Sequence, residues 1–267
     1  MVEPALPREG RLPYNRGMSE ICEVARDGHV GIVRMKRVDK HNAFNRELDA
    51  AVSGGLAELD ADPDVHVAIL TGAGNAFSAG ADMNEAVKAI EGKGRSEGMA
   101  GVYGAVATFR KPLIACVNGI AYGGGALVSI MCDVRVASDN AAFRFPGAAY
   151  GLVVGGSQLP RLIGPAYAKE LLFTARVVRA EEALRIGLVN AVVPHAQVFD
   201  AALEMARLMA ANSPATLVAT KEVVDRATQV DDGQRAEAKW NRGLRTSAEH
   251  HELFRKAAER VAKRGER

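Results

Sequence analysis

The 267-residue chain is poor in cysteine, and its three cysteines, Cys22, Cys116 and Cys132, are scattered. No two of them form a CxxC pair, and no paired histidines lie near them in the sequence. This pattern argues against a structural zinc site and against a disulfide framework. The simplest prediction is a cytoplasmic protein in a reducing compartment, with no metal centre.

Long apolar runs and dense positive charge are also missing. No apolar stretch approaches the roughly 18 residues that a membrane-spanning helix needs. The opening segment has three prolines and no apolar core, unlike a secretory signal. A formal net charge of +2, without a basic stripe, does not favour nucleic-acid binding. We therefore expect no membrane or nucleic-acid partner, whereas a small polyanionic ligand remains compatible.

What is present is typical of a soluble α/β protein. Hydrophobic residues make up 48% of the chain and charged residues 25%, and the length suits one sizeable domain. Strand–loop–helix units in series predict a parallel sheet, and a charged helical pattern takes over near residue 195. We expect a loosely ordered leader at 1–18, an α/β core at 19–195 and a helical C-terminal subdomain at 196–267.

Local patterns place the elements of that core. Two short β-type runs flank Asp27-Gly28, a strong signal for a two-residue hairpin turn. Compact apolar runs predict buried strands, and apolar residues at helical spacing predict helices. The predicted strands are 21–25, 30–35, 65–70, 112–117, 133–137 and 188–193, and the predicted helices include 45–59 and 97–109.

Two glycine-rich loops carry the strongest functional signal, FSAGADM at 77–83 and NGIAYGGGAL at 118–127. Each follows a predicted strand and enters a predicted helix, whose first N–H groups have no partner within the helix. Two such loops side by side could offer two N–H donors to one carbonyl oxygen, which defines an oxyanion hole. A dinucleotide fingerprint fails because Phe77 replaces its third glycine, and neither a phosphate loop nor a GxSxG elbow occurs.

Five segments stand in register along the chain: DKHNAFN (39–45), AFSAGADM (76–83), KPLIACVNGIAYGGGAL (111–127), CDVRVAS (132–138) and FPGAAYGLVVGGSQLPRLIG (145–164). Together they resemble the enoyl-CoA hydratase/isomerase (crotonase) superfamily. The resemblance implies an α/β fold, a ClpP/crotonase-like spiral of ββα units followed by a helical subdomain. It also implies an enzyme of the acyl-CoA lyase or isomerase class, usually a homotrimer or a dimer of trimers.

The resemblance also implies a site. In that superfamily two backbone N–H groups hold a thioester carbonyl, and they map to Ala81 and Gly124. CoA is part of the substrate, so no further cofactor is implied. The contacts of CoA map to a basic turn and to the first of the two glycine-rich loops. These positions are Asp39, Lys40 and His41 for the CoA moiety, and Ala79, Asp82 and Met83 for the adenine and pantetheine side.

The chain departs from the pattern at the two glutamates that hydratases use to activate water. Leu127 and Gly147 occupy these positions and would instead line the acyl side. Each positioned acid–base group contributes roughly 10²–10⁴-fold to a rate, so efficient hydration is doubtful. Tyr150 and Glu85 are weaker candidates for a proton carrier, and we expect the remaining histidines, His29, His66, His195, His250 and His251, at the surface.

Three functions therefore stay open. The first is an enolate-forming reaction on an acyl-CoA, such as a decarboxylation, that needs little beyond the oxyanion hole. The second is a weak or nominal enoyl-CoA hydratase, and the third is a non-catalytic acyl-CoA-binding protein. A serine peptidase, suggested by the fold shared with Clp-type proteases, would need a Ser–His–acid set and is not favoured. Replacing both Leu127 and Gly147 by glutamate is expected to restore some hydration.

Overall fold

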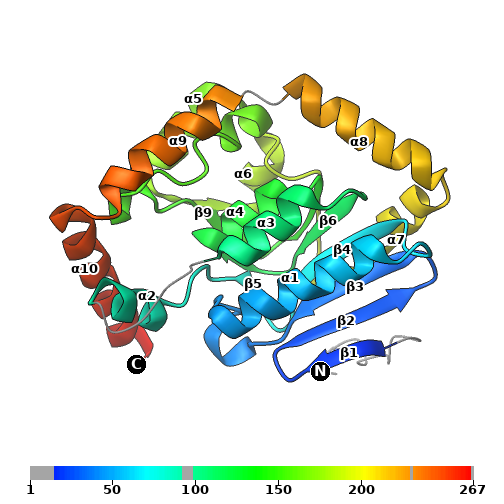
Figure 1. Cartoon of the computed structure of the whole chain (residues 1–267), viewed down its shortest axis with the longest axis horizontal. Coiled ribbons are helices and arrows are strands. Elements are labelled where there is room, and N and C mark those ends of the chain that lie inside the picture. The colour runs from blue at the N-terminus through cyan, green and yellow to red at the C-terminus, as the bar shows by residue number, and fades with distance from the viewer. Residues whose placement is uncertain (1–14, 92–98, 229–230, 266–267) are drawn as a thin grey trace, which may run out of the picture.

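The computed structural model describes residues 15–91, 99–228 and 231–265. Its larger sheet has seven strands in the order β1-β2-β3-β4-β6-β8-β11 (Figure 1). The first three strands are antiparallel, and from β3 onward the neighbours are parallel, as the strand–loop–helix pattern predicted. The strands are β1 Asn15–Ser19, β2 Cys22–Asp27, β3 Val30–Met35, β4 Val67–Gly72, β6 Leu113–Val117, β8 Val134–Ser138 and β11 Ala191–Val193.

The predicted hairpin forms between β2 and β3. Asp27 pairs with Val30, so Gly28 and His29 make the two-residue turn, and Gly28 takes a positive φ of 56°. That backbone conformation suits glycine, which has no β-carbon to clash. β1 adds a further antiparallel strand within the segment that we expected to be a leader, while residues 1–14 lie outside the described residues.

A second sheet of three-residue strands, in the order β10-β9-β7-β5, was not predicted from the sequence. Three of its strands each follow a strand of the larger sheet, and a helix comes next. The repeated strand–strand–helix unit is the ββα spiral that the crotonase-like fold class implied, which confirms that prediction. The short strands are β5 Ala76–Ser78, β7 Ile120–Tyr122, β9 Ala142–Arg144 and β10 Val177–Arg179.

Helices cover both faces of the larger sheet. Alternate residues of a strand point to opposite faces, so β3 presents Val33 to one apolar cluster and Ile32 to the other. The first cluster includes the helices α1, α3 and α4, and the second is covered by α7. The long helices are α1 Arg46–Ala61, α2 Met83–Ile90, α3 Ala100–Thr108, α4 Gly124–Met131, α5 Leu159–Thr174, α7 Val198–Ala210, α8 Pro214–Thr228, α9 Asp231–Leu244 and α10 Ala248–Gly265, with the short α6 at Ala180–Arg185.

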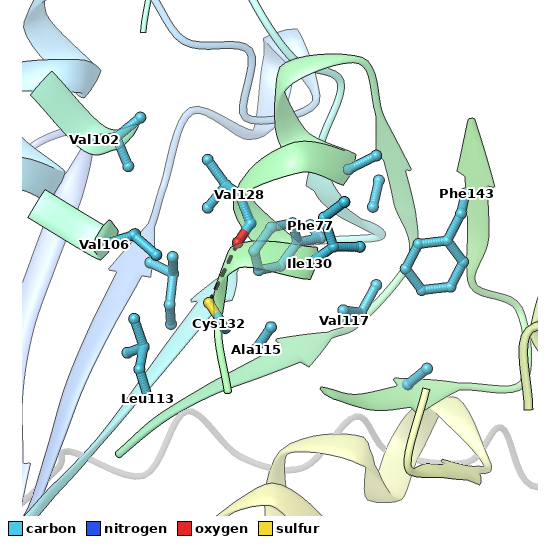
Figure 2. Close-up of a cluster of buried hydrophobic side chains, with 14 of the residues drawn as sticks. Phe77, Val102, Val106, Leu113, Ala115, Val117, Val128, Ile130, Cys132 and Phe143 are labelled. Atoms are coloured by element: carbon cyan, nitrogen blue, oxygen red, sulfur yellow. Dashed lines mark hydrogen bonds between the residues drawn. The ribbon is translucent and has the colours of Figure 1, made fainter. Parts of the chain in front are cut away.

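The core beneath α3 and α4 is shown in Figure 2. Phe77 is fully buried beside Val128 and Ile130 of α4, and this packing fixes β5 against the helix that follows β7. Cys132 ends α4, and its Sγ donates to the carbonyl oxygen of Val128 at 3.4 Å. Burial raises the pKa of the Cys132 thiol to about 12, so this cysteine is an inert core residue.

The helical C-terminal region begins as part of the core. α7 buries Val198, Ala202 and Ala206 against the sheet, so packing continues beyond the boundary that we expected at residue 195. α8 buries none of its residues and is tied to the sheet by Lys221, whose Nζ lies 2.7 Å from Asp133 Oδ2. α9 and α10 pass to the other side of the molecule (Figure 1). Among the described residues, none of the helices combines the length and apolar character needed to cross a bilayer.

Two adjacent glycines of α1 give a matched test of this packing. Gly54 is exposed and has open space around it, so Gly54→Ala should stabilise the protein by about 0.5–1 kcal/mol through helix propensity. A β-carbon on buried Gly55 would stand 2.6 Å from Val24 Cγ2, so Gly55→Ala should destabilise by about 1–3 kcal/mol. Urea unfolding of both variants measures the difference, and equal effects would contradict the packing described for α1.

Candidate active site

The two glycine-rich loops lie side by side because the short strands before them pair. β5 and β7 are parallel, with Ala76 opposite Ile120 and Ser78 opposite Ala121. Parallel strands end at the same edge of a sheet, so the loops that follow them leave from one place. The sequence predicted the two loops, and the structure brings them together.

Glycines set how closely the loops approach. A β-carbon on Gly80 would stand 2.7 Å from the Tyr122 carbonyl oxygen and 2.9 Å from the Gly124 nitrogen. Gly80 also has a φ of +94°, which side chains rarely allow. On the next residue of α4, a β-carbon on Gly125 would overlap the backbone of Ser78. Only residues without side chains permit this contact between the two loops.

Secondary structure leaves the N–H groups of Ala81 and Gly124 without a regular partner. Ala81 forms a parallel bridge with Phe44, in which Phe44 donates to the Gly80 oxygen at 2.7 Å and accepts from Asp82 N–H at 2.9 Å. In such a bridge the residue between these two bonds turns its own N–H away. Gly124 is the first residue of α4, where an N–H has no acceptor inside the helix. Both groups are backbone donors at facing loops.

The basic turn expected to bind CoA is hydrogen-bonded to the first loop. Asp39, Lys40 and His41 are exposed on a 3-10 turn, η1 Val38–Lys40, that ends with His41 in the left-handed region. The His41 carbonyl oxygen accepts from Ala79 N–H at 2.9 Å. The turn and the half-buried Ala79 therefore lie on the same side of the paired loops, and Met83 starts α2 beside them.

Asp82 is buried and fully engaged at the start of α2. Its Oδ1 accepts from Asn84 N–H at 3.0 Å and its Oδ2 from Arg37 Nη1 at 2.6 Å. Burial works to raise the pKa of this carboxyl, but the hydrogen bond and charge of Arg37 outweigh it and lower the pKa below the usual value. The Arg37 guanidinium also donates to the Ala43 oxygen at 2.9 Å. Asp82 thus anchors the loop that carries Ala81.

The two positions without glutamate lie next to the second loop. Leu127 is half-buried on α4, and its Cδ1 lies 4.0 Å from the point where a β-carbon on Gly155 would stand. Gly147 is buried, and a β-carbon there would stand 2.8 Å from the Leu152 oxygen and 3.0 Å from the Val154 nitrogen. Any side chain at 147 requires a backbone shift. A glutamate at 147 would therefore need this local rearrangement before the pair of glutamates could restore hydration, which stays a prediction.

The weaker candidates for a proton carrier have other contacts. The ring of Tyr150 packs edge-on against Phe254 of α10, with ring centroids 5.5 Å apart, and its carbonyl oxygen accepts from Nδ1 of His250 at 2.6 Å. His250 is 6% exposed, so the prediction of a surface position was wrong for this histidine, because α10 folds back onto η2, Ala148–Tyr150. Glu85 is exposed and accepts from Arg46 N–H at 3.1 Å, which fits a residue at a helix start.

Two polar residues that the sequence analysis missed also reach this region. Tyr103 of α3 places its Oη 2.8 Å from the point where a β-carbon on Gly124 would stand. Glu237 of α9 accepts from Gly155 N–H at 3.2 Å and from Ser157 N–H at 3.0 Å. The signal for Tyr103 was a single tyrosine in the small, apolar stretch AGVYGAVAT. No sequence pattern pointed to Glu237, because it lies about eighty residues after Gly155, the residue whose N–H it accepts from.

The Arg37–Asp82 pair predicts a pH-dependent stability. Since the folded-state pKa of Asp82 lies below its unfolded value, its stabilisation is complete above the unfolded pKa of about 4 and is lost as the pH falls through the folded value. Asp82→Asn should lower the free energy of unfolding by about 1–3 kcal/mol at pH 7, and by less at pH 3. The exposed Asp39→Asn is the control in urea unfolding at both pH values. An equal loss at pH 3 and pH 7 would contradict the ion-pair argument.

Comparison with known proteins agrees with this architecture. A family model described as enoyl-CoA hydratase/isomerase matches residues 25–266. The chain is 39% identical over 212 residues to a short-chain-enoyl-CoA hydratase of Clostridium acetobutylicum, covering 77% of this chain and 81% of the relative. It is 37% identical over 227 residues to a carnitinyl-CoA dehydratase of Salmonella paratyphi A, covering 82% and 86%. The crystal structure of an enoyl-CoA hydratase/isomerase from Pseudoalteromonas atlantica T6c has a TM-score of 0.82 at 27% identity, covering 90% of this chain and 97% of that one. The chain therefore belongs to the enoyl-CoA hydratase/isomerase family.

Proposed function

We propose that the protein binds an acyl-CoA thioester and stabilises its enolate between the N–H groups of Ala81 and Gly124. The observation that carries this proposal is the close approach of the two loops, which Gly80 and Gly125 make possible. Two fixed backbone donors on one oxygen polarise the thioester carbonyl and acidify its α-carbon. One such donor is typically worth about 2.7–4 kcal/mol of transition-state stabilisation.

CoA would lie along the 3-10 turn η1 and the loop that follows β5. Lys40 and His41 are exposed beside Ala79, where the lysine ammonium and the imidazole N–H suit the phosphates of a CoA moiety. Met83 and the loop around Asp82 would line the adenine and pantetheine side, and Leu127 and Gly147 the acyl side. CoA enters as part of the substrate, and no other cofactor is required by this proposal.

The chemistry differs from hydration by two glutamates. Leu127 and Gly147 carry no proton, and the space at Gly147 is closed by backbone atoms. Losing both acid–base groups should remove efficient addition of water. A decarboxylation of an acyl-CoA that bears a carboxylate on its α-carbon depends mainly on the two N–H donors, because the breaking C–C bond supplies the electron pair of the enolate, CO₂ leaves and water protonates the α-carbon. An isomerisation would need a proton carrier in addition. The relatives named as an enoyl-CoA hydratase and a carnitinyl-CoA dehydratase support an acyl-CoA as the substrate class in this proposal.

A second candidate is a non-catalytic acyl-CoA-binding protein. The apolar character of positions 127 and 147 favours it, because binding needs the cleft but no proton carrier. The two candidates differ in whether a bound thioester exchanges its α-hydrogens.

We also propose a homotrimer or a dimer of trimers in a reducing, cytoplasmic setting. Large apolar side chains are exposed on the outer helices, which would suit contacts between copies of the chain. All three cysteines are buried. The exposed side chains are Phe173 of α5, Val223 and Val224 of α8 and Trp240 of α9.

Exchange of α-hydrogens in D₂O tests the enolate directly. With solvent deuteroxide taking the proton from the α-carbon and D₂O returning a deuteron, butyryl-CoA mixed with the protein should lose α-hydrogen signal by NMR faster than butyryl-CoA alone. Gly80→Ala would push the Tyr122 oxygen and the Gly124 nitrogen away, so it should slow exchange about 100-fold, by analogy with the loss of one oxyanion donor.

Gly54→Ala is the matched control, because it adds the same methyl group to a glycine with open space and should leave exchange unchanged. Binding of butyryl-CoA without exchange would favour the non-catalytic candidate. Failure to bind any acyl-CoA would overturn the proposed function.

A further inference from the structure

Tyr103 has an unusual place beside the proposed oxyanion hole. It lies on α3, partly buried against the core, and its hydroxyl is 2.8 Å from the point where a β-carbon on Gly124 would stand. That point and the Gly124 nitrogen are bonded to the same α-carbon, so the hydroxyl faces the residue whose N–H the proposed function uses. Met99 Sδ stands still nearer to the same point. The Tyr103 side chain, which belongs to α3, thus reaches the first residue of α4.

The partner of this hydroxyl is a poor one. Tyr103 Oη donates to the Sδ of Met99, one turn earlier, at 3.5 Å. A thioether sulfur is a weak acceptor, whereas a buried phenol normally finds an oxygen or nitrogen partner. A ligand oxygen arriving at Gly124 would be a stronger acceptor than Met99 Sδ. The hydroxyl is therefore placed to exchange a weak bond for a strong one when a substrate binds.

The phenol stays protonated at neutral pH. Burial raises the pKa of Tyr103 well above its ordinary value, and the negative charges of Asp49 and Glu237 add to this effect, while Arg245 opposes it. A neutral phenol is a hydrogen-bond donor and does not remove protons. Its donor strength matters most when the acceptor becomes charged, because hydrogen bonds to ions are about twice as strong as neutral ones.

We propose that Tyr103 is a catalytic residue whose hydroxyl donates a third hydrogen bond to the thioester oxygen, alongside the N–H groups of Ala81 and Gly124. This role rests on the proposed function, because it requires a thioester at that site. The bond strengthens as the oxygen gains charge, so Tyr103 favours the enolate over the neutral thioester. It supplies part of the stabilisation in a cleft where Leu127 and Gly147 bring no polar group.

A pair of ligands separates this role from packing. Acetoacetyl-CoA has an acidic α-carbon and can bind as an enolate, which absorbs in the near ultraviolet, whereas butyryl-CoA binds as a neutral thioester. Tyr103→Phe should weaken binding of the acetoacetyl-CoA enolate about 10- to 100-fold, the range for a hydrogen bond to a charged group. Binding of butyryl-CoA should change little, so the ratio of the two dissociation constants shifts.

Tyr167→Phe is the matched control. Tyr167 is exposed on α5, so removing its hydroxyl should leave the ratio of the two dissociation constants unchanged. A thermal midpoint within about 2–4 °C of the unaltered protein would show that Tyr103→Phe folds normally. An unchanged ratio, or equal weakening of both ligands, would overturn the role of Tyr103 and leave the proposed function intact. If the unaltered protein bound neither ligand, the proposed function would fail and this role with it.

Discussion

The contact between two backbone loops is the constraint on which the rest of the site depends. Gly80 and Gly125 let the loop after β5 touch the start of α4, and the parallel pairing of β5 and β7 holds both loops at one edge. Phe77, buried beneath α4, fixes the same arrangement from the core side. Site geometry here is a property of main-chain packing, so few side chains need to be chemically special.

Much of the larger sheet could be predicted from the sequence, because its strands are compact apolar runs with strong local signals. The hairpin around Gly28 is one example. The helix that follows Asn45 was also predicted, and the Asn45 side chain caps it by accepting from Leu48 N–H at 2.9 Å. The second sheet could not be predicted, since three-residue strands such as Ala76–Ser78 carry too little pattern and exist only through pairing in space.

The site was predictable to the extent that it consists of motifs in one stretch of chain. The loops with Ala81 and Gly124 were found in this way, as was the absence of a carboxylate at Leu127. Tyr103 was not found, since its position beside Gly124 arises only when α3 packs against α4. The tightness around Gly147 was equally invisible, because it arises from a turn that brings the Leu152 oxygen back onto that residue.

The hydrogen bonds between α9 and the segment from Val153 to Ser157 have a consequence for the order in which the protein folds. Asn241 bonds both the N–H and the carbonyl oxygen of Val153, and Glu237, one turn earlier, receives three donors from Gly155 and Ser157. During synthesis the ribosome adds α9 about eighty residues after that segment. The segment from Val153 to Ser157 therefore gains these contacts only after α9 has been synthesised, when the sheet and both loops have already been made.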